Sequence, residues 1–304
     1  MGKSSRGACV DGVLLLDKSG GMSSNLALQK VRRLLNAEKG GHTGTLDPMA
    51  TGLLPLAFGE ATKFSADLLD ADKSYRATLK LGVTTSTGDA EGKITAARQV
   101  NVADDAIAEV LLRFVGAIEQ VPPMYSALKR DGRPLYELAR EGIDVERAPR
   151  QVAVRSLRRV ERTGDELTLD IVCSKGTYVR VLAEDIGYAL GCGAHLNALR
   201  RTRVGPLRLE ESLTLETVEA MPPEARHACL RPVDTLLGSL PRVELDEALA
   251  GRFRQGQRLA MEAQPRGVRV RAYGPAGDLL GTANVTEWGV VAPERLISNE
   301  RRVS

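Results

Sequence analysis

One aspartate lies in a stretch rich in glycine, threonine and proline, GGHTGTLDPMATGLLP, at residues 40–55. Asp47 is the only acidic residue of this stretch and directly precedes Pro48. Proline disfavours helical angles in the residue before it, so we expect Asp47 in a turn or an extended conformation. Its carboxylate is suited either to binding backbone N–H groups as a turn former or to acting as a nucleophile. The loop alone leaves both roles open.

Two tyrosines and an arginine have side chains suited to work beside such a carboxylate. Aromatic residues make up only 4% of the chain, so each tyrosine is informative. Tyr75 is expected either to fill the core at a strand start or to offer its ring for base stacking. Tyr178 is expected at a helix start. Arg180 is either a surface cation or the partner that keeps a carboxylate ionised.

Regular elements are predicted around these residues. GVLLLDK, residues 12–18, is an apolar run typical of a buried strand, and a helix should begin at Ser23 or Ser24 and end at Gly40-Gly41. YRATLKLGV, residues 75–83, alternates apolar and polar side chains and gives the strongest strand signal. Further helices are predicted at 103–116, 134–141 and 178–191, and further strands at 152–160, 167–173 and 196–205.

A short, polar and basic segment interrupts this pattern at residues 122–150. It has too little apolar surface for a core of its own, so we expect an excursion from the sheet that can lie on a ligand. Basic residues outnumber acidic ones between Lys129 and Arg162, and four arginines cluster in residues 200–208. Each cluster alone is typical of a solvated face; together, beside candidate site residues, they favour a polyanionic partner.

The C-terminal part of the chain has a different pattern. After Pro241, short apolar strands alternate with turns, which predicts a small β-rich domain at 240–304 after a larger domain at 1–239. Strands and helices follow one another without regular βαβ alternation. This predicts an α+β fold with a central, mostly antiparallel sheet.

Composition restricts the class of protein further. The chain has 304 residues, 43% of them hydrophobic, and a formal net charge of +3, which permits a nucleic-acid partner without requiring one. The four cysteines and three histidines have no zinc-site spacing, and the glycines have no nucleotide-loop spacing, so we expect no metal and no cofactor. No apolar run is long enough to span a bilayer and no signal peptide is evident, so we expect a cytoplasmic protein without membrane contact.

Five stretches, in order and with compatible spacing, closely resemble the TruB family of tRNA pseudouridine synthases over residues 11–206. They are GVLLLDKSGGMSSN, GHTGTLDPMATGLLP, DKSYRATLKLG, MYSALKRDGRPLYELAREG and CSKGTYVRVLAEDIG…LGCGAHLNALRRTRVG. Two departures are visible, Ser19 where the family usually has proline and Met49 where leucine is usual. The C-terminal part is a weaker match and is similar to the family's PUA-like RNA-binding domain.

The resemblance implies a role for each candidate residue. Asp47 matches the catalytic aspartate, Tyr75 the tyrosine that stacks on the target base, and Arg180 the arginine that pairs with the aspartate. Three more match residues that line the substrate pocket: His42, Tyr178 and Leu199. The candidate contacts to the RNA backbone are Lys18, which is either structural or phosphate-facing, and Lys129, Arg130, Arg200 and Arg201.

The activity that this resemblance implies is isomerisation of the T-loop uridine at position 55 of tRNA, by a monomer that flips the base out of its stack. The sequence leaves open whether the aspartate attacks the base or the sugar. A non-catalytic tRNA-binding protein that uses the same groove is the alternative, although intact Asp47, Tyr75 and Arg180 argue against it. A glycosidase of another kind ranks last, because such enzymes usually need two carboxylates.

Overall fold

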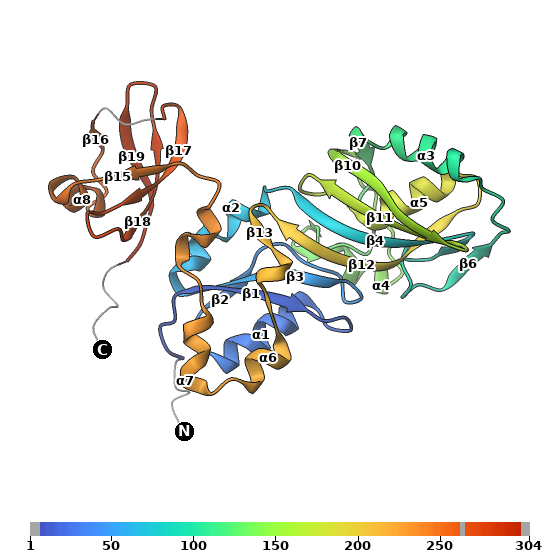
Figure 1. Ribbon diagram of the computed structural model, residues 1–304, viewed down its shortest axis with the longest axis horizontal. Helices are drawn as coiled ribbons and strands as arrows, with labels where there is room; N and C mark the ends of the chain where they lie inside the picture. Colours follow the sequence, from blue (N-terminus) through green and yellow to red (C-terminus); the bar gives the residue numbers. More distant parts are fainter. Residues whose placement is uncertain (1–6, 262–264, 299–304) are drawn as a thin grey trace.

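A ten-stranded mixed sheet forms the centre of the molecule (Figure 1). The computed structural model describes residues 7–261 and 265–298. The main path of the sheet is β14-β1-β3-β12-β4-β11-β10-β7, with β2 beside β3 and β13 beside β12. The β1–β14 and β3–β12 pairs are parallel and the other pairs are antiparallel. The predicted α+β fold with a mostly antiparallel sheet is therefore confirmed.

The strands of this sheet come from most of the chain before residue 215. Their bounds are β1 (Gly12–Lys18), β2 (Gly40–His42), β3 (Thr51–Phe58), β4 (Lys73–Leu81), β7 (Gly116–Gln120), β10 (Arg150–Thr163), β11 (Glu166–Cys173), β12 (Ala194–Val204), β13 (Leu207–Arg208) and β14 (Leu213–Thr214). Side chains alternate along β4, so that Ala77 and Leu79 are buried while Arg76 is exposed. This alternation matches the prediction as far as Leu81, whereas Gly82, with a φ of 80°, ends the strand before Val83.

Helices cover the apolar faces of the sheet. The main core joins the strands to α1, α3 and α5, and a second cluster joins β1 and β3 to η1, α2 and η4 on the other face. The helices are α1 (Ser24–Leu34), α2 (Ser65–Leu69), α3 (Asp104–Arg113), α4 (Leu135–Arg140), α5 (Val179–Ala189), α6 (Leu215–Ala220), α7 (Pro223–Arg226) and α8 (Glu247–Arg254). The 3-10 turns are η1 (Gly59–Phe64), η2 (Leu209–Glu211), η3 (His227–Cys229) and η4 (Val233–Leu237).

The first helix ends earlier than predicted. Ser23 caps α1 as expected, accepting a hydrogen bond from Leu26 N at 3.1 Å. The prediction that Gly40-Gly41 ends the helix is wrong, because the chain turns at Asn36, whose φ is 51°. The amides of Asn36 and Ala37 donate to the carbonyls of Arg33 and Arg32, which is the pairing of a Schellman motif. Asparagine tolerates the left-handed conformation well enough to replace glycine here.

The basic segment at residues 122–150 has little regular structure. It contains α4 and a two-stranded hairpin of β8 (Lys129–Arg130) and β9 (Arg133–Pro134). Leu135 and Leu138 are its buried leucines, which agrees with the predicted lack of an independent core. A second small hairpin, β5 (Val83–Thr85) with β6 (Ile94–Ala97), follows β4 directly.

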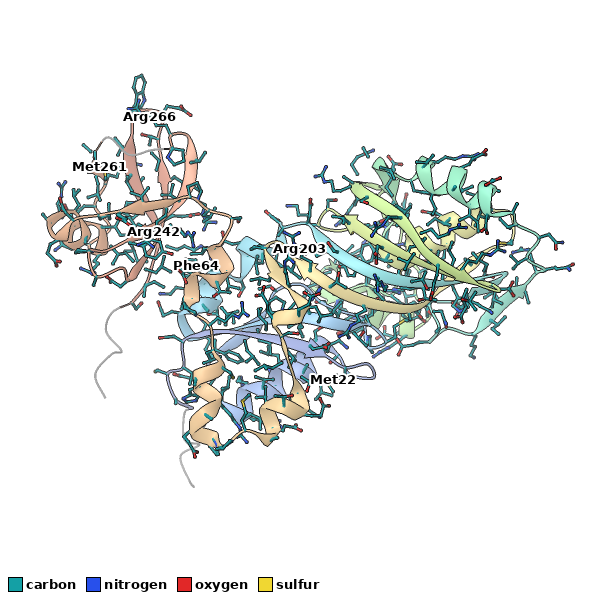
Figure 2. All side chains as sticks on the ribbon, viewed as in Figure 1. Met22, Phe64, Arg203, Arg242, Met261 and Arg266 are labelled. Carbon is teal, nitrogen blue, oxygen red and sulfur yellow. The ribbon has the colours of Figure 1, made fainter. Side chains whose placement is uncertain are left out.

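A five-stranded sheet in the C-terminal part forms a separate lobe (Figure 1). Its strands are β15 (Arg242–Glu244), β16 (Leu259–Ala260), β17 (Val268–Tyr273), β18 (Leu279–Val285) and β19 (Val290–Leu296). The lobe has its own core, to which α8 contributes Ala250 and Phe253. Figure 2 shows Phe64 where the lobe meets the central body, and Leu279 and Ile297 of the lobe join the apolar cluster there. Residues 262–264 and 299–304 of the predicted C-terminal domain lie outside the described part of the chain.

Candidate active site

Hydrogen bonds to Gly21 and Ser24, and one within the loop, hold the loop that carries Asp47 between β2 and β3. The buried Ser24 side chain accepts from Leu46 N at 2.8 Å and donates to Leu46 O at 3.0 Å. Gly21 N donates to Pro48 O at 2.9 Å, and Ala50 N donates to Asp47 O at 3.1 Å. Asp47 therefore does form a turn, but through its backbone carbonyl, so its side chain is not used in the turn.

The Asp47 carboxylate pairs with an arginine that is distant from it in the sequence. Arg180, in the first turn of α5, places Nε 2.9 Å from Asp47 Oδ2 and 3.5 Å from Asp89 Oδ2. The Arg180 and Asp89 side chains are each 5% exposed, whereas that of Asp47 is 36% exposed. One guanidinium thus joins two carboxylates, and only Asp47 remains accessible to a substrate.

The rest of the Arg180 guanidinium is held by backbone oxygens. Nη1 donates to Thr87 O at 3.2 Å, and Nη2 donates to Tyr125 O at 2.6 Å. Asp89 is fixed in turn, because its Oδ1 accepts from Thr87 Oγ1 at 2.5 Å and from Glu91 N at 3.1 Å. Arg180 therefore links the Asp47 loop, the 85–91 loop and the start of the basic segment.

Opposing electrostatic effects act on Asp47. Burial raises the pKa of its carboxyl above the ordinary value, the Arg180 guanidinium acts against this rise, and the Asp89 carboxylate adds to it. Lys18 is a second cation that favours the ionised form of Asp47. Arg180 thus acts in the expected direction, but burial outweighs it.

Two predicted tyrosines lie within electrostatic reach of Asp47. Tyr75 lies on the inward face of β4 and packs against the main core; burial raises the pKa of its hydroxyl and the Arg201 cation opposes this. Tyr178 is the residue before α5, and its backbone is clamped by Gln120, whose Oε1 accepts from Tyr178 N at 3.0 Å. Burial also raises the pKa of Tyr178, with a smaller contribution from Asp47.

His42 and Leu199 lie on strands that border the loop. His42 ends β2, burial lowers its pKa, and its Nδ1 is buried without a hydrogen-bond partner among the described residues. Leu199 is buried on β12, opposite Ala77 of β4, and its carbonyl accepts from Thr51 Oγ1 at 3.4 Å.

Two of the expected RNA contacts are buried, which corrects those predictions. Lys18 and Arg201 are each only 1% exposed. Lys18 Nζ donates to the carbonyls of Ser19, Met22 and Pro48 at 2.9, 2.8 and 3.3 Å. Burial lowers the pKa of Lys18 to about 8. Of the two roles considered for Lys18, the structure supports the structural one.

Arg201 likewise has a structural position. Its Nε donates to Leu53 O at 2.8 Å and its Nη2 donates to Gly44 O at 3.1 Å. These bonds tie β12 to β3 and to the start of the Asp47 loop. A guanidinium enclosed in this way cannot contact a phosphate.

The other three basic candidates reach the surface. Lys129 and Arg130 are exposed on β8, where Arg130 Nη1 donates to Glu146 O at 3.1 Å. The Arg200 side chain is 42% exposed and pairs with Asp17 at 2.6 Å. Figure 2 shows Arg203, a further exposed member of the arginine cluster, on the part of the sheet that faces the C-terminal lobe. RNA contact by these residues stays a prediction.

Sequence reasoning missed four residues that hold the site: Thr87, Asp89, Gln120 and Tyr125. Asp89 lies in STGDAEG, a glycine-containing stretch typical of a turn, and no spacing connects it with Arg180. Tyr125 and Thr87 contribute backbone oxygens, which any residue type supplies. Within residues 7–261 and 265–298, no cluster of three or more His, Cys, Asp or Glu side chains is arranged to hold a metal ion. No described helix is long and apolar enough to cross a membrane.

Comparison with protein families matches most of the chain. Residues 32–179 match the N-terminal domain of the TruB family of pseudouridylate synthases, residues 180–238 the tRNA pseudouridylate synthase B C-terminal domain, and residues 241–297 the C-terminal domain of pseudouridine synthase II TruB. Two relatives called tRNA pseudouridine synthase B, from Aromatoleum aromaticum and Dechloromonas aromatica, are 58% and 59% identical. Each alignment covers 95% of this chain, and 93% and 96% of the respective relative.

The fold is similar to that of a solved structure as well. A chain in the crystal structure of a Cbf5-Nop10-Gar1 complex superimposes with a TM-score of 0.73 and 28% sequence identity. The superposition covers 94% of this chain and 84% of the other.

Proposed function

Because the chain belongs to the TruB family and is an isomerase that makes pseudouridine in tRNA, we propose that Asp47 is its nucleophile and that its target is the T-loop uridine at position 55. The observation that carries the proposal is the position of Asp47. Its carboxylate is accessible, sits on a fixed loop, and is paired at 2.9 Å with the buried Arg180.

The reaction exchanges one bond of the nucleoside for another. The bond between ribose C1′ and uracil N1 breaks, and a bond between C1′ and C5 forms. C5 loses a proton and N1 gains one, so that the atoms balance without an oxidant or a second substrate. The Asp47 carboxylate attacks the nucleoside and leaves again once the base has turned, which divides one difficult step into easier ones.

Arg180 and Asp89 prepare the nucleophile for this step. Arg180 favours the ionised carboxylate electrostatically and fixes its direction by a charge-assisted bond. Asp89 approaches the same Nε atom of Arg180, at 3.5 Å, and so helps to orient the guanidinium. The arrangement exists before substrate binds, so little reorganisation is needed in the transition state.

The tyrosines hold the detached base. Tyr75 lies on the inward face of β4 and Tyr178 at the start of α5, and both lie near the carboxylate. A ring stacked on uracil retains the base while it rotates. A uridine has to leave its stack to reach an aspartate on the protein, so the enzyme flips it out, which costs less in a loop than in a duplex.

The surrounding surface positions the RNA. The basic segment at 122–150 lies against the site, since Tyr125 O accepts from Arg180, and its exposed Lys129 and Arg130 are placed to hold phosphates. We assign residues 1–239 to the catalytic domain and 240–304 to a PUA-like RNA-binding domain. The enzyme acts on tRNA as a cytoplasmic monomer.

The test is a comparison of Asp47→Asn with the wild-type enzyme on an unmodified tRNA transcript. Pseudouridine is mapped by position, and release of tritium from C5-labelled uridine gives the rate. Asp47→Asn should lose all measurable turnover while it still binds tRNA. Asp105→Asn, which changes an exposed carboxylate in the first turn of α3, is the matched control and should keep full activity. Full turnover by Asp47→Asn would remove the nucleophile assignment, and modification away from the T loop would remove the target assignment.

A further inference from the structure

A third carboxylate, that of Glu184, lies close to the Arg180 network. Glu184 lies on α5, four residues after Arg180, and therefore on the same face of the helix. Its side chain is half-buried, and Arg180 and Asp89 both act on it electrostatically. The opposite side of Glu184 borders a solvent-open cavity of about 520 Å³, shared with Asp185, Tyr188 and Arg98.

The Glu184 carboxylate lies directly against the backbone of Gly88. A Cβ atom added to Gly88 would lie 2.7 Å from Oε2 and 2.8 Å from Cδ of Glu184. Gly88 also has a φ of 73°, a conformation that glycine adopts without strain. The backbone angle favours glycine at this position, and the absence of a side chain leaves room for the Glu184 carboxyl group.

Gly88 is the residue between the two that hold Arg180. Thr87 before it supplies the carbonyl that binds Nη1, and Asp89 after it supplies the carboxylate near Nε. On the other side, Gly88 O accepts from Leu196 N of β12 at 3.0 Å. Residues 87–89 are therefore packed between β12 and the Glu184 side chain.

We propose that Glu184 is a positioning residue for catalysis: its carboxyl group packs under Gly88 and so sets residues 87–89, and through them Arg180, against Asp47. The proposal rests on the assignment of Asp47 as nucleophile. It depends on the reach and shape of the side chain rather than on its charge.

The electrostatic surroundings agree with a role that does not need the charge. Burial raises the pKa of Glu184, the neighbouring Asp185 and the Asp89 carboxylate add to the rise, and Arg180 opposes it. Arg98 is the cation on the far side of the cavity. Glutamine, which has the same shape and no charge, should therefore serve at this position.

Three substitutions of Glu184 distinguish the effect of its side-chain length on kcat from the effect of its charge. Glu184→Gln keeps the reach and loses the charge, Glu184→Asp keeps the charge and withdraws the group from Gly88, and Glu184→Ala removes both. We expect Glu184→Gln to retain wild-type kcat, and Glu184→Asp and Glu184→Ala to lower kcat about tenfold or more with KM for tRNA unchanged. Asp185→Asn, which changes the adjacent carboxylate in the same cavity, should keep wild-type kcat.

A double-variant cycle then tests whether Glu184 acts on Arg180 through residues 87–89. In an Asp89→Asn background, Glu184→Asp should lower kcat by much less than in the wild type, because both act on Arg180 through one segment. Melting temperatures of all variants are compared; if Glu184→Ala does not fold, the Asp and Gln variants decide. Wild-type kcat in Glu184→Asp, or a loss in Glu184→Gln that equals the loss in Glu184→Asp, overturns the proposal.

The Asp47→Asn and Glu184→Asp results together distinguish a failure of the positioning role from a failure of the nucleophile assignment. If Asp47→Asn is inactive and Glu184→Asp is fully active, only the positioning role fails. If Asp47→Asn is active, the nucleophile assignment fails whatever the Glu184 variants do.

Discussion

Arg180 binds Asp47 through Nε, at 2.9 Å, and leaves both terminal nitrogens to backbone carbonyls. The fork of the guanidinium is thus divided among three loops, a task that a lysine cannot perform with one ammonium group. We predict that Arg180→Lys lowers kcat about 10²- to 10³-fold although the charge is kept. Single-turnover kinetics on a tRNA transcript will measure this, and tRNA affinity should change little. A lysine variant with near-normal turnover would show that only the charge matters.

Asp89 should influence both the rate and its pH dependence. The Asp89 carboxylate raises the pKa of Asp47, so Asp89→Asn lowers it. Because the nucleophile acts in its ionised form, the rate rises with pH through this pKa, and the acid limb of the kcat profile should move to lower pH in the variant. The plateau should fall by about tenfold or more, since Arg180 loses an orienting partner. Profiles measured from mildly acid to neutral pH test both parts, and an acid limb displaced to higher pH contradicts the electrostatic account.

The elements of the fold could largely be predicted from local pattern. The alternation in residues 75–83 and the apolar helix faces appear in the structure as β4, α3 and α5. The end of α1 differs from the prediction, because Asn36 and not a glycine adopts the left-handed angle that stops the helix. Local sequence identifies a helix well, but several residues can end one.

The site was only partly predictable. Asp47 and Arg180 are 133 positions apart, and only the family resemblance joined them before the fold was known. Asp89 had no such signal, because an acid in a glycine-rich turn has an ordinary structural explanation.

The burial of Arg201 could have been anticipated. It is two residues after the buried Leu199 on one strand and therefore faces the same way, but arginine is usually an exposed residue.

Neighbouring arginines on β12 should therefore respond differently to substitution. The single ammonium group of Arg201→Lys cannot take both positions of the guanidinium, so at least one buried carbonyl loses its donor, and we expect the free energy of unfolding to fall by about 2–3 kcal/mol. Arg200→Ala removes one partly exposed ion pair, worth at most about 1 kcal/mol, and should chiefly weaken tRNA binding. Thermal unfolding and tRNA affinity, measured on both variants, give a matched comparison. Equal melting temperatures for the two would contradict the structural role of Arg201.

The basic hairpin of β8 and β9 should contribute a salt-dependent part of tRNA affinity. Lys129 and Arg130 are both exposed there. If each neutralises a phosphate, Lys129→Ala/Arg130→Ala should reduce the slope of log affinity against log salt by about 1–2. Lys93→Ala/Arg113→Ala removes two exposed cations outside this segment and is the control. An unchanged slope in the hairpin variant would place the RNA on another surface.

Stability should rise with pH on the alkaline side of neutrality because of two buried lysines. Burial lowers the pKa of Lys73 to about 8, as it does for Lys18, and the ordinary value of 10.5 applies to the unfolded chain. Between these two values the unfolded chain binds more protons than the folded one, so the free energy of unfolding increases with pH. Below pH 8 both forms are protonated and the full penalty remains. Each lysine can contribute up to about 3 kcal/mol over this window.

Lys73→Met isolates one of these contributions, because methionine preserves the buried stem and cannot titrate. Lys73 Nζ donates to the carbonyls of Leu69 and Ala71, each at 2.6 Å, and the variant loses these bonds at every pH, so the slope of stability against pH is the quantity to compare. Urea unfolding from pH 7.5 to 10 should show a shallower rise in the variant than in the wild type. Lys175→Met, at an exposed lysine paired with Asp70, should keep the wild-type slope. A parallel rise in all three proteins would mean that Lys73 stays protonated in the folded state, since its removal would then leave the pH dependence unaltered.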